Sequence, residues 1–161
     1  MPDKNQKTAT SPNSQRLALE HFLPYRLSVL TNTVSSNLAR VYAEKFDMTI
    51  PEWRVMATLG RYPGIAASEV ANRTAMDKVR VSRAIGRLKD AGRVTRTVDS
   101  GDRRRSALHL TEKGQAIYRE IVPLAEAYEV DLIDALNAEE IEWLDRILNR
   151  LQTRAQELSS H

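Results

Sequence analysis

Cysteine is missing from this 161-residue sequence, and aromatic side chains make up only 6% of it. Without a thiol the chain can form no disulfide framework, offer no thiolate nucleophile and carry no cysteine redox switch. The apolar fraction of 42% and the modest aromatic content suit a helical globular protein. A chain of this length is expected to form one domain, which we place at residues 16–161.

Long hydrophobic runs are also missing. No stretch approaches the roughly 20 consecutive apolar residues that a membrane span needs. The first 15 residues, MPDKNQKTATSPNSQ, contain no apolar run of the kind found in secretory signals and are rich in polar residues. We therefore expect residues 1–15 to be a flexible tail, and the protein to be cytoplasmic and without a membrane partner.

Residue sets for catalysis or metal binding are lacking as well. The three histidines, His21, His109 and His161, lie far apart and have no metal-binding spacing. Ser68-Glu69 and Asp99-Asp102 are interpreted as a helix start and a turn, because no set of nucleophile and base accompanies them. The expectation is a protein that is not an enzyme and uses no metal and no cofactor.

Positive charge, by contrast, is concentrated in one segment. Residues 78–105 hold ten Lys or Arg residues and three Asp residues, a net charge of +7, whereas the rest of the chain carries −4. A surface built for a polyanion would explain this asymmetry, because neutralising phosphates supplies most of the non-specific affinity for nucleic acids. A solvated helix face with chance clustering of charge is the alternative.

Apolar residues at three- and four-residue steps predict a long helix near the start of the chain. The stripe is Leu23, Leu27, Leu30, Val34, Leu38, Val41 and Tyr42. Because proline is tolerated in the first turn, we expect this helix to begin at Pro24 and to end near residue 46. A second helix should follow Thr49, whose spacing to Glu52 is that of a capping box.

Two further helices are expected close together. A short helix over residues 66–71, a turn over 72–74 and a longer helix over 76–91 predict a helix-turn-helix, whose second helix lies in the major groove of DNA. Gly92 is placed to end the longer helix in the left-handed conformation.

The longer helix has two different faces. Val81, Ile85 and Leu88 fall on one side and predict the buried face. The polar residues that fall largely elsewhere are Lys78, Arg80, Ser82, Arg83 and Arg87. This pattern favours DNA reading, although a purely structural amphipathic helix would have a similar one.

Beyond this helix the periodicity changes. Alternating residues over 94–98 and the run over 107–110 predict two strands, joined by an Arg-rich hairpin tip at 99–105. Two more helices should follow, one capped by Thr111 and one opened by the capping-box spacing of Asn137 and Glu140.

The first and last helical regions are more apolar than a small DNA-binding lobe requires. We therefore expect residues 16–46 and 112–158 to hold two copies of the chain together as a homodimer.

The run "VRVSRAIGRLKDAGRVTRTVDSGDRRRSALHLTEKG" resembles the MarR family of winged helix-turn-helix transcriptional regulators. It has the family's V-[ST]-R-x-x-x-x-L recognition helix, its D-x-x-D-R-R wing and its L-T-x-x-G return, and "TIPEWRVMATL" resembles the family's second helix. The resemblance covers about residues 25–155. It implies a mainly α fold with a small β-hairpin wing, in which residues 50–111 form the DNA-binding lobe and the terminal helices form the dimer.

The resemblance also implies roles for individual residues. Each protomer would place its recognition helix in a major groove and its wing in the flanking minor groove of a pseudo-palindromic operator. The DNA-contacting residues would be Lys78, Arg80, Ser82, Arg83, Arg87, Arg103 and Arg105. The motif gives Arg105 no firm role. Asp102 and Arg104 would be structural wing positions, and Asp77 matches the residue that pairs with the wing arginine, here Arg104.

Members of the family respond to small effectors bound between the dimer helices and the DNA-binding lobe, and this resemblance implies the same here. The arginines near the first helix would suit an aromatic acid or its coenzyme A thioester. The residues that could line such a site are Tyr25, Arg26, Asn37, Arg40, Tyr42, Trp53 and Arg54. Ordinary core packing and solvated charge are the alternative for each of them.

Three functions therefore remain open. The leading one is a ligand-responsive repressor, the second is a ligand-independent or architectural DNA-binding regulator, and the third is a winged-helix module whose wing binds a protein. A basic reading helix together with a basic wing disfavours the third.

Overall fold

The computed structural model describes residues 17–98 and 106–159. The expected tail at residues 1–15 and the hairpin-tip residues Asp102, Arg103, Arg104 and Arg105 lie outside the described residues, so the expectations for them stay predictions. The chain divides into two compact units, residues 1–36 and 37–161, and the division falls inside the first long helix.

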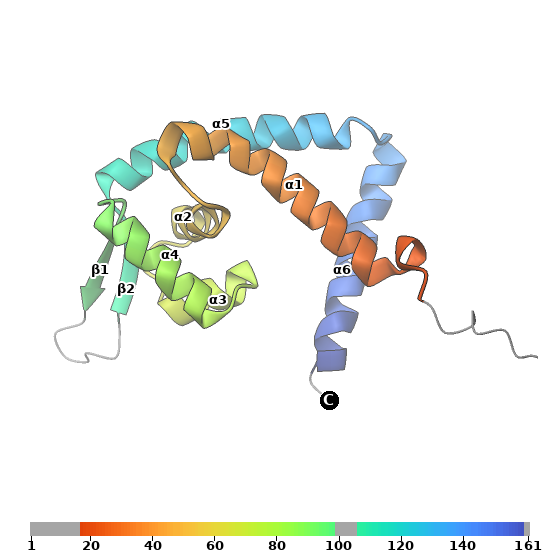
Figure 1. Ribbon diagram of the computed structural model, residues 1–161, viewed down its shortest axis with the longest axis horizontal. Helices are drawn as coiled ribbons and strands as arrows, with labels where there is room; N and C mark the ends of the chain where they lie inside the picture. Colours follow the sequence, from red (N-terminus) through yellow and green to blue (C-terminus); the bar gives the residue numbers. More distant parts are fainter. Residues whose placement is uncertain (1–16, 99–105, 160–161) are drawn as a thin grey trace, which may run out of the picture. The chain divides into compact units, whose positions relative to one another are not determined.

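The described residues form six α-helices, a short 3₁₀ helix and one antiparallel hairpin (Figure 1). This confirms a mainly α fold with a small β-hairpin. In chain order the elements are η1 (Leu19–His21), α1 (Leu23–Phe46), α2 (Ile50–Arg61), α3 (Ala67–Thr74), α4 (Lys78–Asp90), β1 (Val94–Val98), β2 (Ser106–Leu110), α5 (Glu112–Ile133) and α6 (Ala138–Ser159).

The three helix starts that were predicted from capping residues, those of α2, α5 and α6, have these caps. At α2 the Glu52 carboxylate accepts hydrogen bonds from both the amide and the hydroxyl of Thr49, each at 2.6 Å. At α6 the Asn137 amide donates to Glu140, and the Glu140 amide donates back to the Asn137 side chain at 3.0 Å. These bonds use amides that a helix start would otherwise leave without partners.

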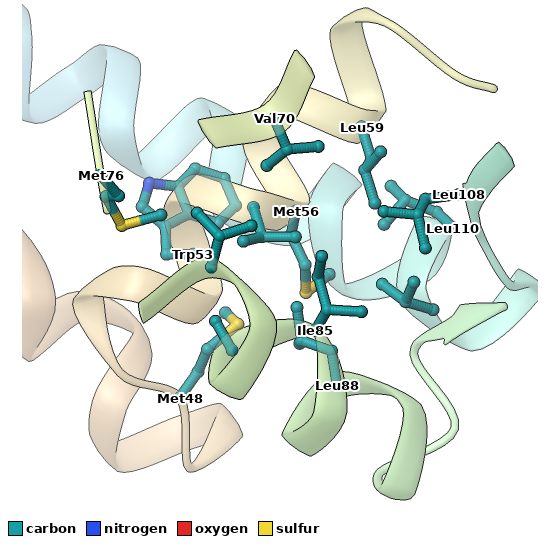
Figure 2. Close-up of a cluster of buried hydrophobic side chains, with 14 of the residues drawn as sticks. Met48, Trp53, Met56, Leu59, Val70, Met76, Ile85, Leu88, Leu108 and Leu110 are labelled. Carbon is teal, nitrogen blue, oxygen red and sulfur yellow. The ribbon is translucent and has the colours of Figure 1, made fainter. Parts of the chain in front are cut away.

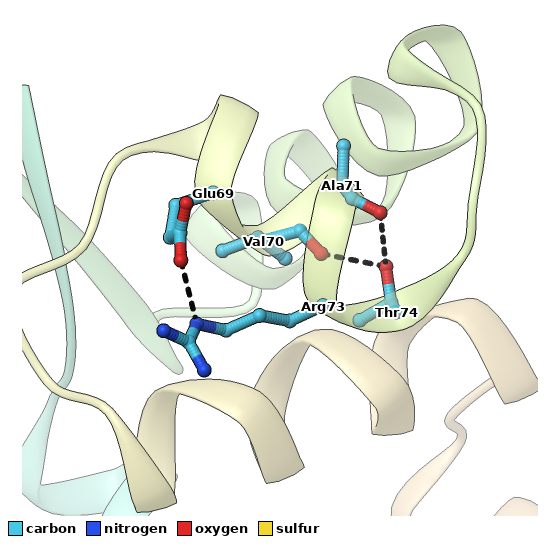
Figure 3. Close-up of polar contacts among 5 residues, drawn as sticks. All are labelled: Glu69, Val70, Ala71, Arg73 and Thr74. Carbon is cyan, nitrogen blue, oxygen red and sulfur yellow. Dashed lines mark hydrogen bonds and ion pairs between the residues drawn. The ribbon is translucent and has the colours of Figure 1, made fainter. Parts of the chain in front are cut away.

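Helix α3 is longer than predicted, since it continues to Thr74 where a turn over 72–74 was expected. Two contacts support its last turn (Figure 3): the Thr74 hydroxyl donates to the Val70 carbonyl at 2.7 Å, and Arg73 pairs with Glu69 at 2.8 Å, one turn earlier. Ala75 then adopts a left-handed conformation with φ of +51° and ends the helix. The expectation of a turn at 72–74 was wrong because these residues find partners along their own helix.

Helix α4 begins two residues later than predicted. Asp77 caps it, with its carboxylate accepting the Arg80 amide at 2.8 Å. At the other end, Gly92 has a φ of +68°, which confirms the expected left-handed stop.

The predicted hairpin is present, with β1 and β2 antiparallel and Arg96 opposite Leu108. The loop before α3 extends the hairpin by one more bridge, because the Leu108 amide donates to the Ile65 carbonyl at 3.0 Å. This bridge fixes the hairpin to the start of α3.

One hydrophobic core underlies these elements (Figure 2). Helices α2, α3 and α4 pack on one another and on the hairpin, and α5 packs on α2 and β2. The buried side chains that Figure 2 labels are Met48, Trp53, Met56, Leu59, Val70, Met76, Ile85, Leu88, Leu108 and Leu110.

The start of α5 is bound to the end of α4. The Thr111 hydroxyl donates to the Gly92 carbonyl and accepts the Gly114 amide, and the Lys113 ammonium donates to the Ala91 carbonyl at 2.9 Å. Gly114 lies so close to the Arg93 carbonyl oxygen that a Cβ atom would overlap it. The run Leu110 to Gly114 therefore holds the end of the helix-turn-helix against α5.

Two segments expose many apolar side chains. All of the described residues of α6 are exposed, including Ile141, Leu144, Leu148 and Leu151. Within the first unit, Leu23, Leu27 and Leu30 are also exposed. No helix among the described residues is both long and apolar enough to cross a bilayer.

Two glycines should respond in opposite ways to substitution by alanine. Gly114→Ala should lower the free energy of unfolding by about 2 kcal/mol or more, because the new Cβ atom overlaps the Arg93 carbonyl. Gly86→Ala in α4 should raise it by roughly 0.5–1 kcal/mol, because no atom lies within 4 Å of the new Cβ and alanine favours the helix. Thermal unfolding at one fixed protein concentration measures both; equal destabilisation would contradict this account of the two sites.

Candidate nucleic-acid interface

Helix α4 buries one side and exposes the other, as its sequence predicted. Val81, Ala84, Ile85 and Leu88 are buried in the core. The five predicted DNA-contacting residues of the helix are all exposed: Lys78, Arg80, Ser82, Arg83 and Arg87. The buried stripe therefore turns the whole basic set outward together.

The exposed surface of α4 has a crest and two flanks. At the rotation of an α-helix, Val79 and Arg83 lie opposite the four buried residues and form the crest. Arg80 and Arg87 lie on the flank facing the start of α2. This flank borders a hollow of about 390 Å³, whose lining also includes the crest residues and residues at the start of α2: Val79, Arg83, Thr49 and Pro51. This flank carries two arginines, with the Asp77 carboxylate beside them.

The other flank faces the hairpin. Lys78 and Ser82 line a second hollow of about 290 Å³ together with Arg96 of β1 and Ser106 of β2. Arg96 is exposed and was not among the predicted DNA-contacting residues. The alternation of Val94, Arg96 and Val98 places it in the strand, but only the packing of the hairpin beside α4 brings it to this flank.

Asp77 is placed at the start of α4 as a helix cap. The hydrogen bond from the Arg80 amide is the main cause that lowers the pKa of its carboxyl, and the Arg80 guanidinium lies 3.8 Å away. The carboxylate is therefore charged at neutral pH. Its predicted pairing with Arg104 stays a prediction, because Arg104 lies outside the described residues.

Arg93 belongs to the basic segment by sequence but not to its outward surface. Its guanidinium donates to the Phe46 carbonyl at the end of α1, and its Nε is buried with no hydrogen-bond partner. Arg93, one of the ten basic residues of the segment, therefore contributes to packing within the lobe.

The predicted ligand-site residues of the second unit have mixed surroundings. Tyr42 and Trp53 are buried in the core with ring centroids 5.7 Å apart. Burial raises the pKa of Tyr42 to about 12, against the opposing effect of the Arg54 guanidinium, so its hydroxyl is neutral at physiological pH. Asn37 and Arg40 are exposed and Arg54 is half-buried.

The other two predicted ligand-site residues, Tyr25 and Arg26, are exposed in the first unit. None of the seven lines either of the two hollows beside α4. Their role in ligand binding stays a prediction.

Several known proteins are similar to this chain in sequence and in architecture. The chain is 25% identical over 122 residues to the transcriptional regulator HosA of Escherichia coli O157:H7, spanning 76% of this chain and 90% of HosA. Its fold is similar to that of Streptococcus pneumoniae FabT in complex with DNA, with 26% identity, a TM-score of 0.69 and coverage of 84% of this chain and 96% of FabT. It is also similar to Bordetella bronchiseptica BpsR, whose DNA binding is regulated by 6-hydroxynicotinic acid, with 22% identity, a TM-score of 0.75 and coverage of 85% and 97%.

A sequence model of the MarR family matches residues 46–105, from the end of α1 into the hairpin. In sequence and in fold, the chain is similar to the MarR family of transcriptional regulators. Its fold is that of a winged-helix protein, in which α3 and α4 form the helix-turn-helix and β1 with β2 forms the wing.

We expect the crest and the flanks of α4 to contact different parts of DNA, the crest the base edges and the flanks the phosphates. Arg83→Ala should change which sequences are preferred, because an arginine on the crest can donate two hydrogen bonds to a guanine edge. Arg87→Ala, on the flank, should weaken binding to all sequences by a similar factor and reduce the salt dependence. Selection from a random duplex pool followed by salt titrations measures both; an unchanged preference for Arg83→Ala would assign that residue to phosphate contacts.

Proposed function

We propose that the chain is a homodimeric repressor that binds a pseudo-palindromic operator and is released from it by a small anionic aromatic ligand. The observation that carries the proposal is the outward basic surface of α4, fixed by a buried stripe on the same helix. Such a helix suits the major groove, where base edges accept hydrogen bonds and phosphates flank both sides.

Double-stranded DNA is the partner that this surface fits. Lys78, Arg80 and Arg87 can bind phosphates on the two flanks, while Ser82 and Arg83 can reach base edges. The predicted wing residues Arg103 and Arg105 would add minor-groove contacts, with Asp102 and Arg104 holding the wing. The similarity to FabT, a relative solved in complex with DNA, supports this proposal.

A second copy of the chain is the partner that the exposed face of α6 fits. The apolar residues of this face are spaced by three, four or seven residues, the spacing of a two-helix seam. They are Ile141, Leu144, Leu148, Leu151 and Leu158. The last two lie 37% and 63% exposed in the isolated chain, so pairing would remove a large apolar surface from water. A two-fold dimer would also present two copies of α4 to the two halves of an operator.

The seam can be tested by a charge placed within it. Leu148→Glu should convert the dimer to a monomer and lower operator affinity by at least tenfold, because the buried carboxylate would have no partner in the interface. Thr153→Glu, on the opposite side of α6, is the matched control and should leave the mass unchanged. Sedimentation gives the mass of each variant, and a dimeric Leu148→Glu variant would place the interface elsewhere.

The proposed ligand is an aromatic acid or its coenzyme A thioester. Arg40 and Arg54 supply positive charge in the second unit. The rings of Tyr42 and Trp53 are in contact there, and the Arg54 guanidinium acts electrostatically on Tyr42. BpsR, which has a similar fold, is regulated by 6-hydroxynicotinic acid, which is an aromatic acid. A ligand that binds more tightly to the conformation with lower DNA affinity would shift the protein toward that conformation and so release the operator. The size of this effect is set by the ratio of the ligand's affinities for the two conformations.

Release from an operator selected for the wild-type chain tests the ligand proposal. 6-Hydroxynicotinic acid, benzoic acid and benzoyl-coenzyme A are the probes, and at least one should raise the melting temperature and displace the operator. Arg54→Gln should raise the concentration for half-release by about tenfold, the loss of one charge-assisted hydrogen bond, whereas Arg61→Gln is the exposed control. If operator binding is sequence-specific but none of the probes alters it, the ligand-independent or architectural regulator is the better description.

A further inference from the structure

We propose that Val79 reads a thymine in the operator by packing against its C5-methyl group in the major groove. The inference rests on the proposed function, because it assigns one base contact within the same DNA interface.

Val79 is the exception among the apolar residues of α4, every residue of which is described. Val81, Ala84, Ile85 and Leu88 are all buried, whereas Val79 is 59% exposed. Most of this side chain is in contact with water, and its burial against another apolar group would be favourable.

Val79 is not part of the hydrophobic core, and it borders the hollow between α4 and the start of α2. The cap of α4 is made by the Asp77 carboxylate and the Arg80 amide, without Val79. The two positions whose apolar contact commonly fixes a helix start are occupied by Met76 and Val81, and both are buried. Valine is also a poorer helix former than alanine, because its branched side chain loses rotamer freedom.

The position of Val79 on α4 favours a contact with a DNA base. Val79 lies on the crest in the first turn, one turn before Arg83, and N-terminal residues of a recognition helix contact base edges. Arg80 and Arg87 on the flank can hold the phosphates while the crest faces the bases. Among the four bases only thymine presents a methyl group in the major groove, so an apolar side chain there selects thymine.

Deoxyuridine, which is thymine without the methyl group, tests the contact directly. An operator is first selected with the full wild-type chain, and each thymine of one half-site is then replaced singly by deoxyuridine. At one position the wild-type affinity should fall about fourfold, the factor that corresponds to one buried methyl group. The Val79→Ala variant should bind the thymine operator about fourfold more weakly and lose most of its response to deoxyuridine at that position.

Lys78→Ala is the matched control on the neighbouring residue. It should bind more weakly than the wild type but keep the full response to deoxyuridine, because a lysine reads charge and not a methyl group. Thermal unfolding should show that both variants fold, since both side chains are exposed.

Two results would overturn the inference: a wild-type chain indifferent to deoxyuridine at every thymine, or a Val79→Ala variant that keeps the full loss at the same position. Failure of the proposed function gives a different result. In that case the wild-type chain enriches no sequence from the pool, and both the proposed function and the proposed contact of Val79 with thymine are rejected.

Discussion

Burial of the apolar stripe of α4 against α2 and the hairpin is the interaction on which the DNA interface depends. Val81, Ala84, Ile85 and Leu88 occupy one side of the helix, and all four are buried. Rotating α4 would expose these side chains, at about 1.5–3 kcal/mol for each of the larger ones. The outward direction of Arg83 is thus set by buried residues of the same helix, which hold the proposed DNA-binding surface in place.

Both ends of α4 are held by hydrogen bonds that reinforce this orientation. Asp77 caps the first turn, and the carbonyl groups of Ala91 and Gly92 accept hydrogen bonds from Lys113 and Thr111. With Gly114 in close contact with the Arg93 carbonyl, the end of the reading helix cannot move apart from the first turn of α5. A displacement of α5 would therefore be transmitted to α4 through backbone contacts, which is a physical route by which a ligand could alter DNA affinity.

Much of the fold could be predicted from the sequence because its signals are local. The capping boxes at Thr49 and Asn137 formed where their spacing predicted, and Gly92 ends α4 in the expected conformation. The end of α3 was mispredicted, because Asn72 to Thr74 is polar and turn-like in composition, whereas the bonds from Thr74 and Arg73 keep it helical. Composition alone does not distinguish a turn from a well-supported last turn of a helix.

By itself, the sequence determined which side of α4 is buried, where its basic residues gather and that the first and last helical regions are more apolar than the lobe needs. A helix repeats every 3.6 residues, so its two faces can be assigned from spacing alone. Only the tertiary structure decided that Arg93 turns inward to Phe46, that Arg96 joins Lys78 and Ser82 on the wing side, and that the rings of Tyr42 and Trp53 are in contact. These contacts join residues far apart in the chain, and their partners are fixed by packing of the whole lobe, not by any local pattern.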